Sequence, residues 1–299
     1  MIDRYLLRYF LAVVDHGTFS RAATHCNVSQ PTLSVGIAKL ERLVGAALFM
    51  RSNQRVGLTD AGSRFLGHAR KIETEFLLAQ QAVSGVETTT LLRIGWLGSV
   101  ASHLVTPAVT AAAQAGTQIE LLEGSERELV RHLGQGRIDV ALTLVGRGGE
   151  RFLEEPLMAE GYALAVPQTH RLADRDVIGA EELAGDVMIV RRHCEVLSET
   201  SRHFTERGIR PHFALRSVQD DRVLAMVAAG LGVTVMPESH RATGVMRPRL
   251  AGFAHRRTVG LLYGSQSETL QSTSHPFLDA IRTRGQNQPA HFPNMRTAT

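Results

Sequence analysis

The sequence predicts an α/β protein with an N-terminal winged helix-turn-helix, and three observations support this fold class. Residues 18–42 contain two short helical patterns joined by a tight polar turn. Residues 60–86 carry an apolar stripe at helical spacing. From residue 91 onward, strand and helix patterns alternate, which is typical of α/β domains. A chain of 299 residues is long enough for two or three such domains.

Composition indicates a globular protein outside the membrane. Hydrophobic residues make up 43% of the chain, and no apolar run reaches the length of about 18 residues that a membrane helix requires. The N-terminus carries charges within its apolar stretch and lacks the layout of a secretory signal. The two cysteines, Cys26 and Cys194, imply no disulfide framework. We therefore expect a cytoplasmic protein.

Positive charge is concentrated at the N-terminal end of the chain. Residues 1–59 contain seven Lys and Arg against three Asp and Glu, a balance of +4, and the formal net charge of the whole chain is also +4. The remaining 240 residues therefore balance to zero. A basic head on a neutral body favours a polyanionic partner that contacts only the head.

The helix pair in residues 18–42 has the signals of a helix-turn-helix. Thr18 and Ser29 are placed to cap the first and second helices, and Pro31 lies in the first turn of the second, where a missing N–H costs nothing. Polar side chains crowd the N-terminal end of the second helix, which is the end that a helix-turn-helix inserts into the major groove. The alternative is an ordinary helical hairpin at a domain surface.

The segments around this pair complete a winged helix-turn-helix. Residues 3–15 have the apolar spacing of a first helix that packs behind the pair. Two short extended pieces flank residues 52–54 and form the predicted wing, which carries Arg51 and Arg55. Arginines that flank a turn beside a reading helix are well placed to contact phosphates.

A long helix is expected over residues 60–86, capped by Thr59 or Asp60. Its apolar stripe suits a dimerisation helix, which would present two reading helices about 34 Å apart on DNA. The alternative is a helix that lies on its own domain. Residues 87–90 then form a short linker. The predicted dimerisation residues are Phe65, Ala69, Ile72, Phe76, Ala79 and Val83.

The rest of the chain predicts two similar α/β halves with a parallel sheet, and the cleft between them is the natural ligand site. Pro107 is expected to bend or break the first helix of this part, and the tail from residue 286 looks frayed. Strands are expected at 92–97, 118–122, 137–145, 152–158, 162–166, 187–190, 211–218, 233–236 and 258–263. Helices are expected at 99–115, 126–134, 196–207, 220–229 and 269–284.

Four segments resemble LysR-type transcriptional regulators. The first, FSRAA…NVSQPTLS…KLE…G..LF.R…..LTDAG, spans residues 19–62 and resembles the family's N-terminal domain in spacing and residue type over more than 40 positions. The other three resemble the family's effector-binding domain. They are GRIDVALT at 136–143, PLMAEGYALAVPQTHRLA at 156–173 and MVAAGLGVTVMPES at 226–239.

The resemblance implies a winged helix-turn-helix, a long dimerisation helix and a two-lobed effector-binding domain like the periplasmic binding proteins. It also implies a homotetramer that binds double-stranded promoter DNA, contacts RNA polymerase and changes transcription when a small-molecule effector enters the cleft. No metal or other cofactor is implied. The corresponding domains are residues 1–59, 60–90 and 91–299, with lobe I at 91–160 and 266–299 and lobe II at 161–265.

The resemblance also carries over DNA contacts by matching position. In this family, positions 35 and 36 are usually long polar residues, whereas this chain has Val35 and Gly36. Val35 suits a thymine methyl group, and Gly36 would let the backbone approach DNA closely. Lys39 has the alternative of an ordinary solvated lysine. The expected groove residues are Ser29, Gln30, Pro31, Thr32, Ser34 and Val35, and the expected phosphate contacts are Lys39, Arg51 and Arg55.

The resemblance places the effector site at the junction of the lobes, at the turn after the first strand, the turn near Ser125 and the segment around Cys194. Residues 98–100 end a strand and open a helix, whose free N–H groups attract a carboxylate or phosphate. The alternative for Ser99 is that it only caps this helix. Thr143 and Tyr263 are added because each lies at a strand end that faces the presumed crevice. The expected effector residues are Gly98, Ser99, Val100, Ser125, Thr143, Cys194 and Tyr263.

Two alternative functions remain open, and an enzyme is not expected. Cys194 follows Arg191, Arg192 and His193, which favour a thiolate. Peroxide-sensing relatives use a cysteine in this region with a second one a few residues on, but the residue nine positions later is His203. The first alternative is a single-cysteine redox-responsive regulator, and the second is a solute-binding protein that does not bind DNA. The sequence lacks HExxH, C-x-x-C, P-loop and G-x-S-x-G motifs.

Overall fold

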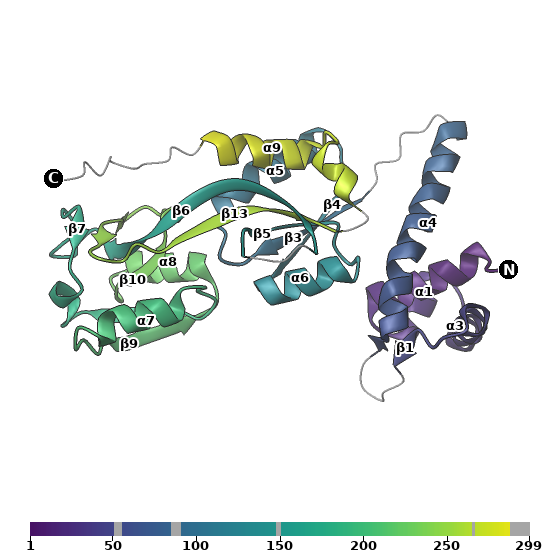
Figure 1. Cartoon of the computed structure of the whole chain (residues 1–299), viewed down its shortest axis with the longest axis horizontal. Coiled ribbons are helices and arrows are strands. Elements are labelled where there is room, and N and C mark those ends of the chain that lie inside the picture. The colour runs from purple at the N-terminus through teal and green to yellow at the C-terminus, as the bar shows by residue number, and fades with distance from the viewer. Residues whose placement is uncertain (51–55, 85–90, 148–150, 265–266, 288–299) are drawn as a thin grey trace.

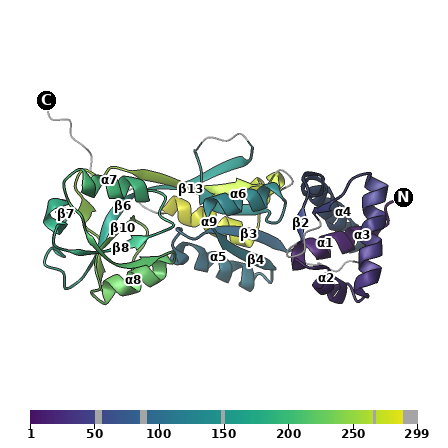
Figure 2. The same ribbon diagram turned by 90° about the horizontal axis from the view of Figure 1, so that it is seen from below.

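The computed structural model describes residues 1–50, 56–84, 91–147, 151–264 and 267–287. It contains a helical N-terminal domain, a long helix and two α/β lobes (Figure 1). In both Figure 1 and Figure 2, lobe I lies between the N-terminal domain and lobe II. None of the described helices combines the length and apolar composition needed to cross a membrane.

Three helices and a two-stranded hairpin form the N-terminal domain around one apolar core. The side chains of Thr18 and Ser29 accept hydrogen bonds from backbone N–H groups three residues later, which confirms both predicted caps. The two strands are antiparallel and flank the predicted wing, whose Arg51 and Arg55 lie outside the described residues. The elements are α1 (Arg4–His16), α2 (Phe19–His25), α3 (Gln30–Val44), β1 (Phe49–Met50) and β2 (Gly57–Leu58).

Helix α4 (Asp60–Ser84) begins against the N-terminal domain. The Thr59 Oγ1 accepts a hydrogen bond from Gly62 N at 2.9 Å, so Thr59 is the cap. Ala69 is fully buried in the N-terminal core, and the Phe65 ring packs edge-on against Phe10 with centroids 5.1 Å apart. These two members of the stripe therefore serve their own domain, as the alternative interpretation proposed.

The later part of the α4 stripe is free of the N-terminal core. Ile72 is 41% exposed and Phe76 is 44% exposed, and Ala79 is also exposed. The side chain of Val83 lies outside the described residues. An apolar surface on residues 72–79 suits a partner helix, so dimerisation through this part stays a prediction.

The strands of the two lobes form one nine-stranded sheet and one separate pair. The strands are β3 (Leu92–Leu97), β4 (Ile119–Gly124), β5 (Val140–Leu144), β6 (Leu153–Pro167), β7 (Val177–Ile178), β8 (Val187–Arg191), β9 (His212–Ser217), β10 (Thr234–Pro237), β11 (Val245–Met246), β12 (Arg249–Leu250) and β13 (Arg256–Tyr263). The large sheet has the order β4-β3-β5-β13-β6-β12-β7, with β10 and β11 also paired to β6. Strands β3, β4 and β5 are parallel, but β13 runs antiparallel to β5 and β6. The expected parallel sheet is therefore a mixed one.

Two strands connect the lobes. β6 is a single strand of 15 residues where the sequence predicted two separate pieces, and it runs from lobe I into lobe II beside the antiparallel β13 (Figure 1). Residues 259–263 of β13 pack in the lobe I core. The boundary between the lobes on this strand therefore lies before Val259 rather than at residue 265.

The helices cover the sheet and frame the cleft. α5 and α9 lie on one face of the lobe I sheet, and α6 lies on the other (Figure 1). Pro107 is inside α5 without ending it, and α5 begins at Ser102 rather than at residue 99. The helix expected at 269–284 is split into a 3₁₀ turn, η2, and α9. The helices are α5 (Ser102–Gln114), α6 (Glu126–Gly134), η1 (Glu181–Leu183), α7 (Leu197–Thr205), α8 (Asp220–Ala228), η2 (Glu268–Gln271) and α9 (Pro276–Asn287).

Candidate DNA-binding surface and effector cleft

Helix α3 buries one face in the N-terminal core and presents its N-terminal end to solvent. Its buried positions repeat at helical spacing, and Val35 on the opposite face is 67% exposed. The Ser29 and Thr32 hydroxyl oxygens lie 2.7 Å apart, which fixes the first turn. Most of the predicted groove residues therefore share one accessible surface. Ser29, Gln30, Pro31, Thr32 and Val35 are exposed, and Ser34 is half-buried.

Gly36 faces helix α1 rather than open space. A Cβ atom at this position would lie 2.6 Å from Cδ2 of Tyr9 and 3.6 Å from Cδ2 of Leu6. The expectation that Gly36 lets the backbone approach DNA is therefore wrong. The glycine instead allows α1 and α3 to pack closely, because any side chain would displace the Tyr9 ring.

Two charged side chains of α3 make contacts within the domain. Lys39 Nζ donates to the Tyr5 hydroxyl at 3.0 Å and lies 3.4 Å from an Asp3 carboxylate oxygen. Its predicted phosphate contact would have to compete with these partners. Glu41 Oε1 accepts hydrogen bonds from the backbone N–H groups of Leu48 and Phe49, which attaches the wing to the reading helix.

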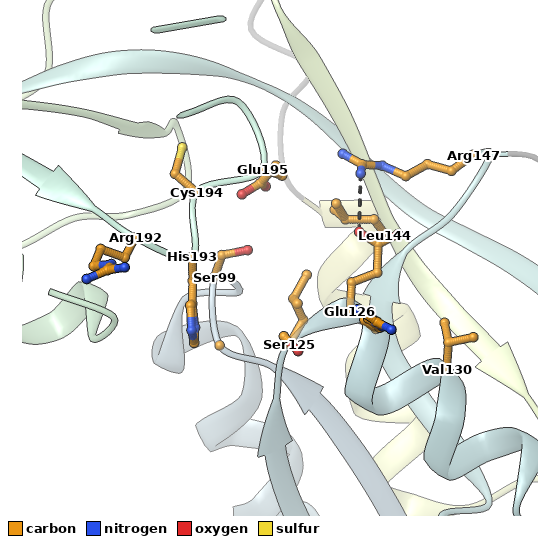
Figure 3. A pocket seen from close by; sticks show the side chains of 13 residues that line it. Ser99, Ser125, Glu126, Val130, Leu144, Arg147, Arg192, His193, Cys194 and Glu195 are labelled. Atoms are coloured by element: carbon orange, nitrogen blue, oxygen red, sulfur yellow. Dashed lines mark hydrogen bonds and ion pairs between the residues drawn. The ribbon is translucent and has the colours of Figure 1, made fainter. Parts of the chain in front are cut away.

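A cavity of about 580 Å³ lies between the lobes. Its walls are turns that follow β3, β5 and β8, together with the first turn of α6, as Figure 3 shows. The carboxyl ends of parallel strands and a helix N-terminus therefore meet here, as in other α/β ligand sites. The lining residues are 97–99, 125–127, Val130, Leu144, Arg147 and 192–195.

The structure brings together four of the predicted effector residues. Gly98, Ser99, Ser125 and Cys194 line the cavity. Ser125 caps α6 in a capping box, since its backbone N–H donates to Glu128 Oε2 at 2.9 Å. The first turn of α6 therefore presents its free N–H groups toward the cleft.

The other three predicted effector residues do not line the cavity. Val100 and Thr143 are buried in or beside the lobe I core. Tyr263 is fully buried and pairs with Val140, at the opposite end of β5 from the cleft. Its hydroxyl is taken up by Glu155 and Arg282, so Tyr263 has a structural role. The sequence placed it wrongly because β13 runs antiparallel to β5.

Ser99 is held by Arg257 rather than acting as a helix cap. The Arg257 Nη1 donates to Ser99 Oγ at 3.0 Å, and Nη2 donates to the Ser99 carbonyl at 2.8 Å. The same guanidinium donates to Glu160 Oε1 from Nε and Nη2, and to Glu195 Oε1 from Nη1. Arg257 on β13 and Glu160 on β6 thus connect a turn of lobe I to a turn of lobe II.

These groups are buried and ionised. The Arg257 side chain is 1% exposed and that of Glu195 is 6% exposed. Burial alone would raise the pKa of Glu195, but the Arg257 guanidinium, a backbone hydrogen bond and the Arg191 charge together outweigh burial and hold the pKa below its usual value. Burial would likewise lower the pKa of Arg257, and the two carboxylates raise it instead. Reasoning from the sequence missed both residues: Arg257 stands in no recognisable motif, and Glu160 lies in the family-like segment 156–173 without any feature that marks it as a site residue.

The Cys194 thiol is half-buried beside a second buried ion pair. Burial raises the pKa of the thiol, and nearby Arg191 opposes this only in part. Arg191 Nη1 lies 3.5 Å from Sγ, while its Nε donates to Asp220 at 2.7 Å. The guanidinium is thus committed mainly to Asp220. The sequence interpretation that the RRHCE cluster favours a thiolate is not supported by this balance.

The remaining charges of the cavity favour an anion. Arg147 pairs with Glu126 at 3.2 Å, and Glu195 is already bound to Arg257. Arg127 and Arg192 also line the cavity, and neither has a carboxylate partner among the residues that the structure describes. Together with the start of α6 they give the site a positive balance.

Family comparisons match both the DNA-binding part and the cleft-containing part of the chain. Residues 5–63 match the family described as "Bacterial regulatory helix-turn-helix protein, lysR family", and residues 86–286 match "LysR substrate binding domain". This chain belongs to the LysR family of transcriptional regulators. It therefore combines a DNA-binding helix-turn-helix with an effector-binding domain, and the fold class predicted from the sequence is confirmed.

LysR relatives match along most of the chain. The DNA-binding transcriptional dual regulator OxyR of Escherichia coli is 30% identical over 288 residues, covering 93% of this chain and 94% of that protein. The regulator AlsR of Bacillus subtilis is 31% identical over 242 residues, covering 78% of this chain and 80% of that protein.

Solved LysR structures share the fold. Full-length OxyR from Pseudomonas aeruginosa superposes with a TM-score of 0.68 at 22% identity, covering 95% of each chain. Full-length CbnR bound to its target DNA superposes with a TM-score of 0.55 at 20% identity, covering 94% of this chain and 99% of that one.

Proposed function

We propose that this LysR regulator binds promoter DNA through the exposed end of α3 and the wing, and that a small acidic molecule in the interlobe cleft controls this binding. The observation that carries the proposal is the cavity of about 580 Å³, where strand ends, the start of α6 and Arg127 and Arg192 meet, two arginines without a carboxylate partner in the described parts of the chain. Concave sites with a few convergent polar groups are the usual ligand sites of α/β domains.

The DNA-bound form is proposed to be a dimer or tetramer that also contacts RNA polymerase and works in the cytoplasm. The exposed stripe on residues 72–79 of α4 supports association of two chains. Two chains would place two α3 helices on successive turns of the duplex. The solved CbnR complex with its target DNA supports DNA as the partner of this fold.

A mobility-shift titration combined with Trp96 fluorescence tests the proposal. Trp96 Nε1 donates to the Val100 carbonyl at 3.0 Å, beside the turn that carries Gly98 and Ser99. A cleft ligand is therefore expected to change Trp96 emission at the same concentrations that change DNA affinity. Small mono- and dicarboxylic and phosphorylated acids form the panel. A ligand that alters DNA binding without changing Trp96 emission, or binds equally to Arg127→Ala and wild type, contradicts the cleft assignment.

A second candidate is a peroxide-responsive regulator. Several relatives carry the name "Hydrogen peroxide-inducible genes activator", and one from Haemophilus influenzae is 32% identical over 238 residues. Cys194 lies in the cleft, which supports this candidate, whereas its raised pKa and the absence of a nearby second cysteine oppose it. Peroxide-dependent DNA binding that Cys194→Ser abolishes would establish it.

A further inference from the structure

Arg257 binds two carboxylates with a single positive charge. One guanidinium carries a single positive charge, yet Glu160 and Glu195 both accept its N–H groups. The two carboxylates therefore share one positive charge, and they differ in how many of the guanidinium N–H groups they accept. One of the two carboxylates is therefore the less firmly held partner.

Glu160 is the firmly held partner. It lies on strand β6, and its Oε1 accepts from both Nε and Nη2 of Arg257, at 2.9 Å and 2.8 Å. Its Oε2 accepts from Ser239 N at 2.7 Å, so both oxygens are satisfied. Removal of Glu160 would leave the Ser239 N–H and two N–H groups of Arg257 without this acceptor.

Glu195 is the exchangeable partner. It lies on the turn between β8 and α7, and it contacts Arg257 through Nη1 alone. Its Oε2 is buried and has no hydrogen-bond partner of normal geometry among the described residues, while the Tyr162 hydroxyl and the Glu195 backbone N–H lie close to the carboxylate. The side chain lines the cavity next to Cys194, and its carboxylate lies near Ser99 in Figure 3.

The hydrogen bond between Glu195 and Arg257 lies at the wall of the cleft. Arg257 Nη1 donates to both Ser99 Oγ and Glu195 Oε1, and these two residues line the cavity. The guanidinium therefore lies directly behind the wall that they form. An acid that enters the cleft reaches Nη1 by taking the position of Glu195, because Ser99 is held in its turn by both Nη1 and Nη2.

We propose that Glu195 is a built-in carboxylate ligand of Arg257, and that an acidic ligand binds in the cleft by replacing it. The exchange keeps the number of carboxylates on Arg257 constant, so it adds no unpaired charge to the buried cluster. Arg257 connects the turn of residues 192–195 to Ser99 of lobe I, and the exchange breaks this connection. The inference rests on the proposed function of the cleft as the effector site.

Chemical rescue with acetate tests the exchange in the full-length chain. In Glu195→Ala the position on Arg257 is vacant, and acetate restores the missing carboxylate. Acetate, balanced with chloride at constant ionic strength, is expected to raise the thermal midpoint of Glu195→Ala saturably by about 3–6 °C. Wild type should respond less than a third as much. Glu126→Ala is the matched control, because Glu126 also lines the cavity but pairs with the exposed Arg147.

Equal responses in all three proteins, or no response in Glu195→Ala, would overturn the proposal. Glu195→Gln keeps the shape of the side chain and guards against a folding failure of the alanine variant. Its response to acetate should lie between those of Glu195→Ala and wild type, and a response no greater than that of wild type also overturns the proposal. Acetate replaces Glu195 itself, so this result does not depend on the natural effector. The proposed function fails separately, if no cleft ligand alters DNA binding.

Discussion

Arg257 and Ser99 are 158 positions apart in the chain, yet Arg257 Nη1 donates to Ser99 Oγ at 3.0 Å inside the protein. Through this guanidinium, a turn of lobe I is bound to Glu160 on the connecting strand β6 and to Glu195 on lobe II. The stability of the effector domain and the arrangement of its cleft therefore depend on the same side chain.

Arg257→Met is expected to lower the free energy of unfolding by about 3–5 kcal/mol, because it leaves buried carboxylates without a counter-ion. Urea denaturation monitored by circular dichroism measures the change. Arg147→Met is the control, since its pair with Glu126 is partly exposed and should contribute less than about 1 kcal/mol. Equal losses in the two variants would mean that the buried Arg257 cluster contributes no more to the free energy of unfolding than the partly exposed Arg147 pair.

Gly36→Ala is expected to destabilise the N-terminal domain by about 1–3 kcal/mol, because the new methyl group would displace the Tyr9 ring. Truncation of that ring should make room for the methyl, so in a double-mutant cycle Gly36→Ala should cost less in a Tyr9→Ala background. Weakened DNA binding with unchanged stability would instead favour a position of Gly36 at the DNA.

Gln30→Ala is expected to reduce discrimination at one base pair of the operator by about 10- to 100-fold, since Gln30 is exposed at the reading end of α3. Competition mobility shifts with single-base operator variants measure this ratio. Gln114→Ala, at the exposed end of α5 in lobe I, is the matched control and should leave the ratio unchanged. A uniform loss of affinity over all operator variants would argue against a base contact.

Phe76→Glu is expected to weaken dimerisation at least tenfold, because it places a charge in the exposed apolar stripe of α4. In the single chain the Arg4 guanidinium carbon lies 4.9 Å from the centroid of the Phe76 ring, and Phe76 is 44% exposed. Sedimentation equilibrium gives the dissociation constant. Glu75→Gln changes an exposed neighbour on another face of the helix, and a similar loss there would count against the stripe as the interface.

The buried His203 predicts a loss of stability at acid pH. Burial lowers the pKa of its imidazole in the folded chain, and Arg207 at 3.3 Å from Nδ1 lowers it further. The unfolded chain therefore binds the proton first, and stability should fall as pH decreases below about 6.5. His203→Gln should flatten the pH dependence of urea unfolding between pH 7.5 and about 5.5, whereas His212→Gln, which is exposed, should not. Parallel curves for wild type and His203→Gln would refute this.

Features that depend on nearby residues were predictable from the sequence. Thr18 and Ser29 cap their helices because each hydroxyl reaches an N–H group three residues later. The motif residues of the winged helix-turn-helix and of the effector domain likewise stand at fixed distances from one another in the sequence. These local signals were enough to predict the fold class and the cleft residues Gly98 and Ser99, whereas the family resemblance supplied Ser125 and Cys194.

Features that depend on contacts between distant residues were not predictable. Nothing in the local sequence distinguishes an antiparallel β13 from a parallel one, and this direction decides that Tyr263 lies away from the cleft. The role of Gly36 depends on its contact with Tyr9. The role of Arg257 depends on its hydrogen bonds to Ser99 and Glu160. None of these partners lies nearby in the sequence. Arg51 and Arg55 lie outside the described residues, so their predicted phosphate contacts stay a prediction.

The path of β13 has a consequence for synthesis of the protein. Residues 259–263 and the buried side chains of α9 belong to the core of lobe I, although lobe II is translated before them. The lobe that emerges first from the ribosome therefore exposes part of its core until translation is nearly complete, while lobe II is already available to fold. A nascent or prematurely terminated chain lacking α9 would present that apolar surface to chaperones and proteases.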